Sequence, residues 1–251
     1  MVVTTSVHYT DEQKKEAREL ADRLGWEFVE RREVDFRQTT FVIGKDGPVL
    51  YGPDKGNRLF FHPSLAKTRI AQFDLGKTDY LVRAMDLKQG ESVLDCTLGL
   101  ASDALVASHA VGEGGTVTGL ESEQAVSEIV RLGMRSYSGH SGTVWNPVCS
   151  RIDIINANYR DYLKTAGDNS YDVVYFDPMF DTEISTSTEM NPLRDFANFE
   201  KVRRDDIEQA CRAARRRVVM KSYKYDKTLD RLGFRRIPSK RKIHFGYIPV
   251  D

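Results

Sequence analysis

From Gly90 onward, short apolar segments alternate with segments of helical spacing, and this alternation constrains the fold more than any other feature. The apolar segments are rich in β-branched residues and read SVLDC, GTVTGLE, RIDIIN, YDVVYFD and RRVVMK. Between and after them lie the helical patterns ASDALVASHAV, EQAVSEIVRLGMRSY, DDIEQACRAA and DKTLDRLG. Strands separated by helices form parallel sheets with helices on both faces. We therefore predict an α/β fold for this part of the chain.

The first 63 residues have a different pattern and predict a small α/β appendage. A β-branched run, Val2 to Thr5, precedes Thr10 and Gln13, whose spacing is typical of a capping box. We expect a helix that runs to about Leu24 and ends at Gly25. The segments WEFVE, TTFVIG and PVLYG predict short strands with hairpin connections, GPDKGNR a loop, and HPSLAKTRI the start of a helix. The predicted domains are residues 1–63 and 64–251.

Composition excludes several classes of protein. At 251 residues and 40% hydrophobic content the chain can bury a core, and we expect a soluble protein. No apolar stretch approaches the length of a membrane span, and MVVTTSVHYT lacks the features of a signal peptide, so we predict a cytoplasmic location without a membrane partner. The three cysteines form no CxxC pair and the five histidines are scattered, so we predict no metal site and no disulfide framework.

Charge is distributed unevenly along the chain. Residues 201–251 hold 16 Lys+Arg against 6 Asp+Glu, a net charge of +10, which leaves −10 for residues 1–200 because the whole chain is neutral. The clusters RAARRR (Arg212 to Arg217) and RRIPSKRK (Arg235 to Lys242) would suit an RNA backbone, although a run of charge is more often a solvated face.

Candidate cofactor residues follow the first two strands of the predicted sheet, where open α/β sheets bind ligands. Asp95, Thr97 and Gly99 form the first loop, in which glycine lets a ligand approach the backbone and Asp95 accepts hydrogen bonds or organises the loop. The loop lacks the G-x-G-x-x-G pattern, which argues against a nicotinamide cofactor. Glu121 ends the second strand, where a carboxylate binds ribose hydroxyls in Rossmann-like domains.

The third strand leads into NANYRDYL. Asn158 there could hydrogen-bond an adenine edge, and Tyr159 or Tyr162 could pack on its ring. Asparagine at the end of a strand is also common turn chemistry, so both interpretations stay open.

The fourth strand ends in DPMF, and this segment carries the predicted chemistry. Asp177 and a backbone carbonyl near Pro178 are two acceptors suited to the NH protons of an amino group on a flat base, and Phe180 would stack on that base. A strand-ending Asp-Pro turn followed by core hydrophobes is the alternative. The DPMF segment follows two other strand ends of cofactor-binding type, and this order favours the functional interpretation.

The motifs LDCTLGLASDAL, LES, NANY, VVYFDPMF, TEM and RRVVMK resemble, in order and spacing, those of the RsmJ family. These are class I S-adenosylmethionine-dependent methyltransferases that modify a guanine N2 in small-subunit ribosomal RNA. The resemblance spans about Ser92 to Lys221 and implies a Rossmann-like fold with a mostly parallel seven-stranded sheet. It also implies cofactor contacts from Ser102, Asp103, Glu121, Ser122, Asn158, Tyr159 and Asp177. The family has a second glycine in the first loop where this chain has Ala101.

Candidate substrate contacts lie downstream of the same motif, at Met179, Glu189, Met190 and Lys221. The segment from Glu183 to Phe196 is predicted to be a loop that closes over a base, or else an ordinary exposed connection. Lys221 would meet a phosphate or extend its side chain at the sheet edge. The predicted catalytic residues are Asp177, Pro178 and Phe180, with RNA as the partner.

Two other functions remain open on the sequence. An adenine-N6 methyltransferase would use the same kind of motif, although guanine offers donors at both N1 and N2 and so suits one carboxylate better. A non-catalytic RNA-binding protein could keep the same fold.

Overall fold

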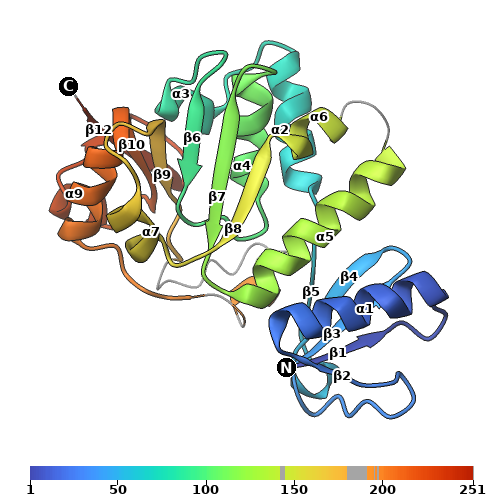
Figure 1. The fold of residues 1–251 in the computed structure, drawn as a ribbon. Coiled ribbons are helices and arrows are strands. Elements are labelled where there is room, and N and C mark those ends of the chain that lie inside the picture. The colour runs from blue at the N-terminus through green and yellow to red at the C-terminus, as the bar shows by residue number, and fades with distance from the viewer. Residues whose placement is uncertain (142–144, 180–190, 195, 197, 251) are drawn as a thin grey trace.

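A computed structural model describes residues 1–141, 145–179, 191–194, 196 and 198–250 (Figure 1). The described chain forms two β-sheets. One belongs to the N-terminal region and the other to the rest of the chain.

The larger sheet has seven strands in the order β11-β12-β10-β9-β6-β7-β8. Its strands are β6 (Ser92–Asp95), β7 (Thr116–Glu121), β8 (Ile152–Asn156), β9 (Tyr171–Phe176), β10 (Ala214–Tyr223), β11 (Arg235–Arg236) and β12 (Ile243–Pro249). The pairs among β6, β7, β8, β9 and β10 are parallel, and β12 is antiparallel to both β10 and β11. The predicted α/β fold with a mostly parallel seven-stranded sheet is confirmed.

The strand order of this sheet reverses between β6 and β9. From β6 the chain proceeds outward to β7 and β8, and β9 and β10 then lie on the other side of β6. Such a switch point opens a crevice at the carboxyl ends of the two central strands, where ligands bind in open α/β sheets. Topology thus directs attention to the residues that follow β6 and β9.

Helices cover both faces of the larger sheet. They are α2 (Ser64–Asp74), α3 (Tyr80–Met85), α4 (Ser102–Val111), α5 (Gln124–Ser141), α6 (Trp145–Ser150), α7 (Tyr159–Thr165), α8 (Asn191–Arg194), α9 (Arg204–Ala213) and α10 (Thr228–Arg231). Buried residues of α2 to α6 share one apolar cluster with Val93, Val117 and Tyr175. Those of α7, α9 and α10 share the other with Leu94, Val174 and Phe176. Successive residues along each strand therefore pack into two different cores, one on each face, as expected for a sheet buried on both faces.

The N-terminal sheet has the order β2-β1-β3-β4-β5, with a short helical turn before β5. Its elements are β1 (Val2–Thr5), α1 (Asp11–Leu24), β2 (Glu27–Phe28), β3 (Thr40–Gly44), β4 (Gly47–Tyr51), η1 (Pro53–Lys55) and β5 (Arg58–Phe60). The capping box of Thr10 and Gln13 and the left-handed Gly25 that ends α1 are both present, as predicted. The expected hairpins are found only at β3-β4 and β4-β5. For β2 the expectation is wrong, because β2 pairs in parallel with β1, the two being connected through α1.

Helix α5 joins the two sheets, because it packs on the larger sheet and also contacts β4 and β5. Gly133 of α5 lies so close to Phe61 that an added Cβ would be 2.2 Å from the Phe61 Cβ. On the same helix, the buried carboxylate of Glu128 accepts hydrogen bonds from Arg23 of α1 and from Arg131. The N-terminal region is therefore packed directly against the larger unit. We keep the domain boundary after residue 63 as a proposal.

The basic cluster from Arg212 to Arg217 is engaged within the chain. Its four arginines form ion pairs with carboxylates, namely Asp168, Asp172, Glu91 and Asp86. They lie at the end of α9 and the start of β10, which is the opposite end of the strand from the crevice. This cluster contributes to the fold, and the predicted solvated face is not what the structure shows.

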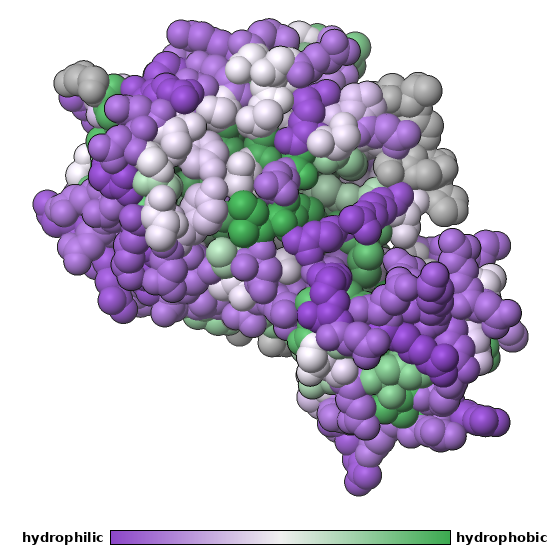
Figure 2. All heavy atoms as spheres, in the orientation of Figure 1, coloured by the Kyte–Doolittle hydropathy of each residue, from purple (hydrophilic) through white to green (hydrophobic). Residues whose placement is uncertain are grey.

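On the face drawn in Figure 2, hydrophilic side chains cover most of the molecule, and an apolar area lies over β7 and β8. No described helix is both long enough and apolar enough to cross a bilayer.

Candidate active site

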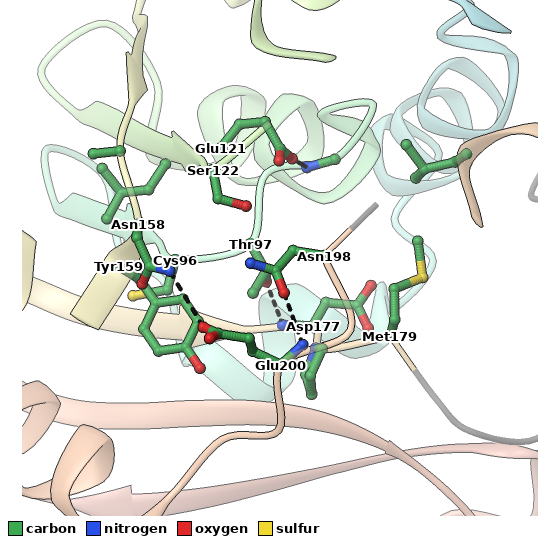
Figure 3. Close-up of a pocket in the computed structure, with 15 residues that line it drawn as sticks. Cys96, Thr97, Glu121, Ser122, Asn158, Tyr159, Asp177, Met179, Asn198 and Glu200 are labelled. Carbon is green, nitrogen blue, oxygen red and sulfur yellow. Dashed lines mark hydrogen bonds between the residues drawn. The ribbon is translucent and has the colours of Figure 1, made fainter. Parts of the chain in front are cut away.

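A pocket opens at the carboxyl ends of β6, β7, β8 and β9 (Figure 3). Its walls come from the loops that follow these strands and from the segment before α9. They consist of Cys96, Thr97, Gly99, Leu120, Glu121, Ser122, Ala157, Asn158, Tyr159, Asp177, Pro178, Met179, Leu193, Asn198 and Glu200. The structure therefore brings together eight of the residues predicted to bind cofactor or to act in catalysis, namely Thr97, Gly99, Glu121, Ser122, Asn158, Tyr159, Asp177 and Pro178.

Glu121, at the end of β7, is held by two backbone amides. Its Oε2 accepts from the Gly99 amide at 3.0 Å and its Oε1 from the Glu123 amide at 2.9 Å. Gly99 has a φ of +50°, a conformation that favours glycine, and an added Cβ would lie 3.4 Å from Leu193. Burial raises the pKa of Glu121, while these amide donors oppose the rise. The carboxylate is thus oriented by the backbone and has little freedom to turn.

The following residues of the first loop also adopt defined positions. Ala101 has a φ of +60°, a left-handed conformation that costs an alanine roughly 1–2 kcal/mol. Its amide donates to Leu98 O at 2.8 Å, and helix α4 starts at the next residue. Alanine therefore occupies here a turn that suits glycine. The buried Oγ of Ser102 has no hydrogen-bond partner among the described residues.

Asn158 has the turn chemistry that the sequence left open, while its predicted contact with an adenine edge stays a prediction. It is the N-cap of α7, with its Oδ1 accepting from the Arg160 amide at 2.9 Å, and it also lines the pocket. Its Nδ2 donates to Glu200 Oε2 at 3.2 Å. The ring of Tyr159 packs edge-on against Phe176, with 5.4 Å between centroids, and its buried hydroxyl has no partner among the described residues. Tyr162 lies outside the pocket and shares a hydrogen bond with Tyr171.

Asp177, directly after β9, is fixed at both its backbone and its side chain. Its amide donates to Thr97 Oγ1 at 2.6 Å, which ties the ends of β6 and β9 together (Figure 3). Its Oδ2 accepts from Lys221 Nζ at 2.6 Å. Among the described residues none hydrogen-bonds Oδ1. Among the described residues, one carboxylate oxygen is therefore anchored by Lys221 and the other has no hydrogen-bond partner.

Lys221 lies in β10, which is flanked by β9 and β12. The predicted position at the sheet edge is therefore wrong, and the side chain is directed to Asp177 and Asp103 instead. Burial alone would lower the pKa of Lys221, but the two carboxylates outweigh it and raise that pKa above its ordinary value. Burial raises the pKa of Asp177, which the charge of Lys221 opposes. A phosphate contact of Lys221 stays a prediction.

Asp103 sits behind this pair in a partly buried network of charges. Its Oδ1 accepts from Arg69, and its Oδ2 from Tyr175 Oη at 2.7 Å and from Lys221 at 3.2 Å. Burial acts to raise the pKa of Asp103, but the charges of Lys221 and Arg69 outweigh it, so the pKa lies below its usual range. Arg69 also binds Asp79, the N-cap of α3. The predicted cofactor contact of Asp103 stays a prediction, because both oxygens already have partners.

Asp95 is buried beside this network. Its Oδ1 accepts from the Thr97 amide at 3.0 Å. Asp95 therefore organises the first loop, which is one of the two roles predicted for it. Burial raises the pKa of Asp95 to about 8, and the neighbouring charges of Asp103 and Asp177 add to the rise. Burial of Asp95 thus favours the neutral form of its carboxyl group.

Three predicted residues, Phe180, Glu189 and Met190, lie outside the described residues, as does most of the segment predicted to close over a base. Met179 is described and lines the pocket. The structure also adds residues that the sequence reasoning missed. Arg69, Asp79, Asn198 and Glu200 reach the site from distant segments, whereas Tyr175 lies two residues before Asp177 on β9.

The comparisons with known proteins decide the family. A family model described as "Putative SAM-dependent methyltransferase" matches residues 59–245. The chain belongs to this family of S-adenosylmethionine-dependent methyltransferases. This methyltransferase is 35% identical to the uncharacterized protein YpiP of Bacillus subtilis, over the whole of both chains.

Two further relatives carry a named activity. The ribosomal RNA small subunit methyltransferase J of Marinobacter nauticus is 28% identical over 58% of this chain and 53% of its own. That of Pseudomonas aeruginosa is 26% identical over 82% of this chain and 78% of its own. The resemblance to the RsmJ family is thus confirmed, and the cofactor is S-adenosylmethionine.

The fold of this methyltransferase also matches a solved structure. A SAM-dependent methyltransferase from Neisseria gonorrhoeae superposes with a TM-score of 0.67 and 18% identity, covering 100% of this chain and 96% of the other. At this level of identity the match supports the class I fold and no more.

The residues of the pocket fit S-adenosylmethionine. The oriented carboxylate of Glu121 is an acceptor for ribose hydroxyls, and the buried hydroxyl of Tyr159, which also lines the pocket, has no partner among the described residues. The buried Oγ of Ser102 also has no partner there, although Ser102 does not line the pocket. The left-handed conformation of Gly99 suits glycine, so this position of the loop carries no side chain. We propose that Asp95, Thr97, Gly99, Ser102, Asp103, Glu121, Ser122, Asn158, Tyr159 and Asp177 hold or support the cofactor.

Proposed function

We propose that this methyltransferase methylates the exocyclic N2 of a guanine in small-subunit ribosomal RNA. The observation that carries the proposal is the wall formed by Asp177, Pro178 and Met179, in which one oxygen of Asp177 is anchored by Lys221. The names of the relatives from Marinobacter and Pseudomonas support the choice of ribosomal RNA.

The chemistry of the wall suits an aromatic amine. An exocyclic nitrogen is a poor nucleophile because its lone pair is delocalised into the ring. The Oδ1 of Asp177, which has no partner among the described residues, and the Pro178 carbonyl accept its N–H hydrogens, which localises the lone pair and orients it. Bound S-adenosylmethionine supplies an electrophilic methyl carbon. Methyl transfer would leave the sulfur as a neutral thioether, and the carboxylate of Asp177 would accept the proton that the nitrogen loses.

Asp177 is suited to act as an acceptor because Lys221 opposes the effect of burial on its pKa. Guanine presents donors at N1 and N2, so one carboxylate can accept from both. We propose that Phe180 stacks on the base and that Met179, Glu189, Met190 and Lys221 contribute to the substrate side.

The test is mass spectrometry of nucleosides from the ribosomal RNA of a strain that lacks the gene. The strain is complemented with wild type, with Asp177→Ala, or with Asp161→Ala as a control at an exposed carboxylate of α7. We expect N2-methylguanosine to fall in the deletion and to return with wild type and Asp161→Ala, but not with Asp177→Ala.

Other results would contradict the proposal in distinct ways. If N6-methyladenosine follows this pattern instead, the base is adenine. If no methylated nucleoside changes, ribosomal RNA is not the methyl acceptor. A last outcome concerns the purified proteins. If Asp177→Ala and wild type bind RNA equally and neither transfers a methyl group, the protein is a non-catalytic RNA-binding protein.

A further inference from the structure

A second groove adjoins the pocket on the side of β10. It shares Pro178 and Met179 with the pocket and continues along the end of β10 to α10. Tyr225, Lys227 and Arg231 lie along it. We refer to it as the Tyr225 groove. Because its start coincides with the wall proposed to hold the acceptor base, whatever occupies it is next to the reacting group.

Tyr225 presents a large ring surface to solvent. The residue is 78% exposed, although its ring also makes an edge contact with Tyr223 at 6.4 Å between centroids. Lys224 Nζ lies 5.4 Å from the centroid of the Tyr225 ring. An exposed aromatic ring beside a cation is a platform on which a nucleobase stacks.

The groove is also positively charged. Lys227 and Arg231 form no ion pair among the described residues, in contrast to the arginines from Arg212 to Arg217. Asp226 is the carboxylate in the groove, and its Oδ1 accepts from the Thr228 amide at 2.7 Å. The two cations are thus available to phosphate groups, whereas the carboxylate of Asp226 is hydrogen-bonded at the N-terminus of α10.

We propose that the Tyr225 groove binds a nucleotide next to the target base in single-stranded RNA. The base stacks on Tyr225, and Lys227 and Arg231 contact the adjoining phosphates. This inference rests on the proposed RNA substrate and deepens it, since it states that the strand must be unpaired beside the target. Single-stranded nucleic acids are recognised by this combination of stacking ring and cationic groove.

The test measures binding of a labelled single-stranded RNA of about eight nucleotides by fluorescence anisotropy at several salt concentrations. The variants are Tyr225→Ala, Tyr225→Phe, Lys227→Ala and Arg231→Ala. Tyr9→Ala and Lys15→Ala are matched controls at solvent-accessible positions in the N-terminal region. The affinity for S-adenosylmethionine, measured by calorimetry, shows that each variant is folded.

We expect Tyr225→Ala to weaken RNA binding about 5- to 100-fold and Tyr225→Phe to stay within about 2-fold of wild type, because phenylalanine keeps the stacking surface. Loss of Lys227 or Arg231 should reduce the slope of log K against log salt by about 0.7 each. The controls and the affinity for S-adenosylmethionine should not change.

Three results would overturn the inference. One is that Tyr225→Ala binds RNA as tightly as wild type while wild type methylates RNA. This result would contradict the role of the Tyr225 groove and leave the proposed function intact. Another is displacement of the RNA by a poly-glutamate peptide as efficiently as by unlabelled RNA, which indicates an acidic protein segment as occupant. The last is absence of RNA binding by wild type, with no methyl transfer to RNA, which removes the proposed function as well.

Discussion

Lys221 Nζ lies 2.6 Å from Asp177 Oδ2 and connects the residue at the end of β9 to the buried network behind the pocket. The same nitrogen is 3.2 Å from Asp103 Oδ2. One lysine therefore compensates two carboxylates that burial would otherwise favour in the neutral form. The negative charge of Asp177 at the pocket therefore depends on its contact with Lys221.

Replacement of Lys221 tests that dependence. Lys221→Met leaves Asp103 and Asp177 without their shared cation. Breaking a fully buried pair costs about 3–5 kcal/mol, which is the upper limit for these partly buried groups. We expect a loss of at most that order in the free energy of urea unfolding, with a smaller loss for Lys221→Arg. If RNA is methylated, the acid limb of the pH–rate profile should move to higher pH in Lys221→Met, because the lysine no longer opposes the raised pKa of Asp177. Equal stability of Lys221→Met and wild type would contradict this assignment.

Glu121→Gln should weaken cofactor binding more than folding. The amide keeps one acceptor, but its NH2 group then faces one of the two backbone donors from Gly99 and Glu123. Hydrogen bonds to a charged group contribute roughly 1.5–3 kcal/mol, so the Kd for S-adenosylmethionine should rise about 10- to 100-fold in isothermal calorimetry. Glu123→Gln, two residues away, does not line the pocket and is the matched control. An unchanged Kd for Glu121→Gln would exclude Glu121 from the cofactor site.

Asp95 makes the stability of the protein depend on pH. Its folded pKa of about 8 lies above the ordinary value of 3.8, so the folded state binds a proton that the unfolded state has released between these values. The stability from this group is fully present below about pH 4 and is lost as the pH rises toward 8, with a slope of at most about 1.4 kcal/mol per pH unit.

The variant Asp95→Asn mimics the neutral form and keeps the acceptor for the Thr97 amide. We expect its stability relative to wild type to increase by about 2–4 kcal/mol between pH 5 and pH 8, as measured by urea unfolding. A difference that stays constant over this range would show that Asp95 is already ionised at pH 5 in the folded protein.

Gly133→Ala tests the junction between α5 and the N-terminal region. The new Cβ would be 2.2 Å from the Phe61 Cβ, which rotation of the phenylalanine side chain cannot move. Overpacking costs about 1–3 kcal/mol, and the helix preference of alanine returns about 1 kcal/mol. We expect a net loss of up to about 2 kcal/mol in the free energy of unfolding. Gly167→Ala, where the nearest atom is 4.0 Å away, is the control and should be close to neutral.

The sequence by itself determined the order of the elements and the class of the fold. The alternation of apolar strands and helices after Gly90 predicts a parallel sheet, because each strand must be buried on both faces and each helix on one. It also determined that candidate residues follow the ends of β6, β7, β8 and β9, since functional groups collect at that edge of such a sheet. Local signals such as the capping box at Thr10 depend on neighbours three residues apart and were equally readable.

Only the tertiary structure decided which charges meet. Lys221 belongs to an interior strand, which no pattern within β10 reveals, and its partners Asp103 and Asp177 are remote in sequence. In the same way Arg69 and Tyr175 converge on Asp103, and β2 pairs with β1 in parallel. These contacts depend on how the elements are placed in space, whereas composition and periodicity report only on each element by itself. The local pattern therefore predicted where the site lies, and the packing of distant segments set its charge state.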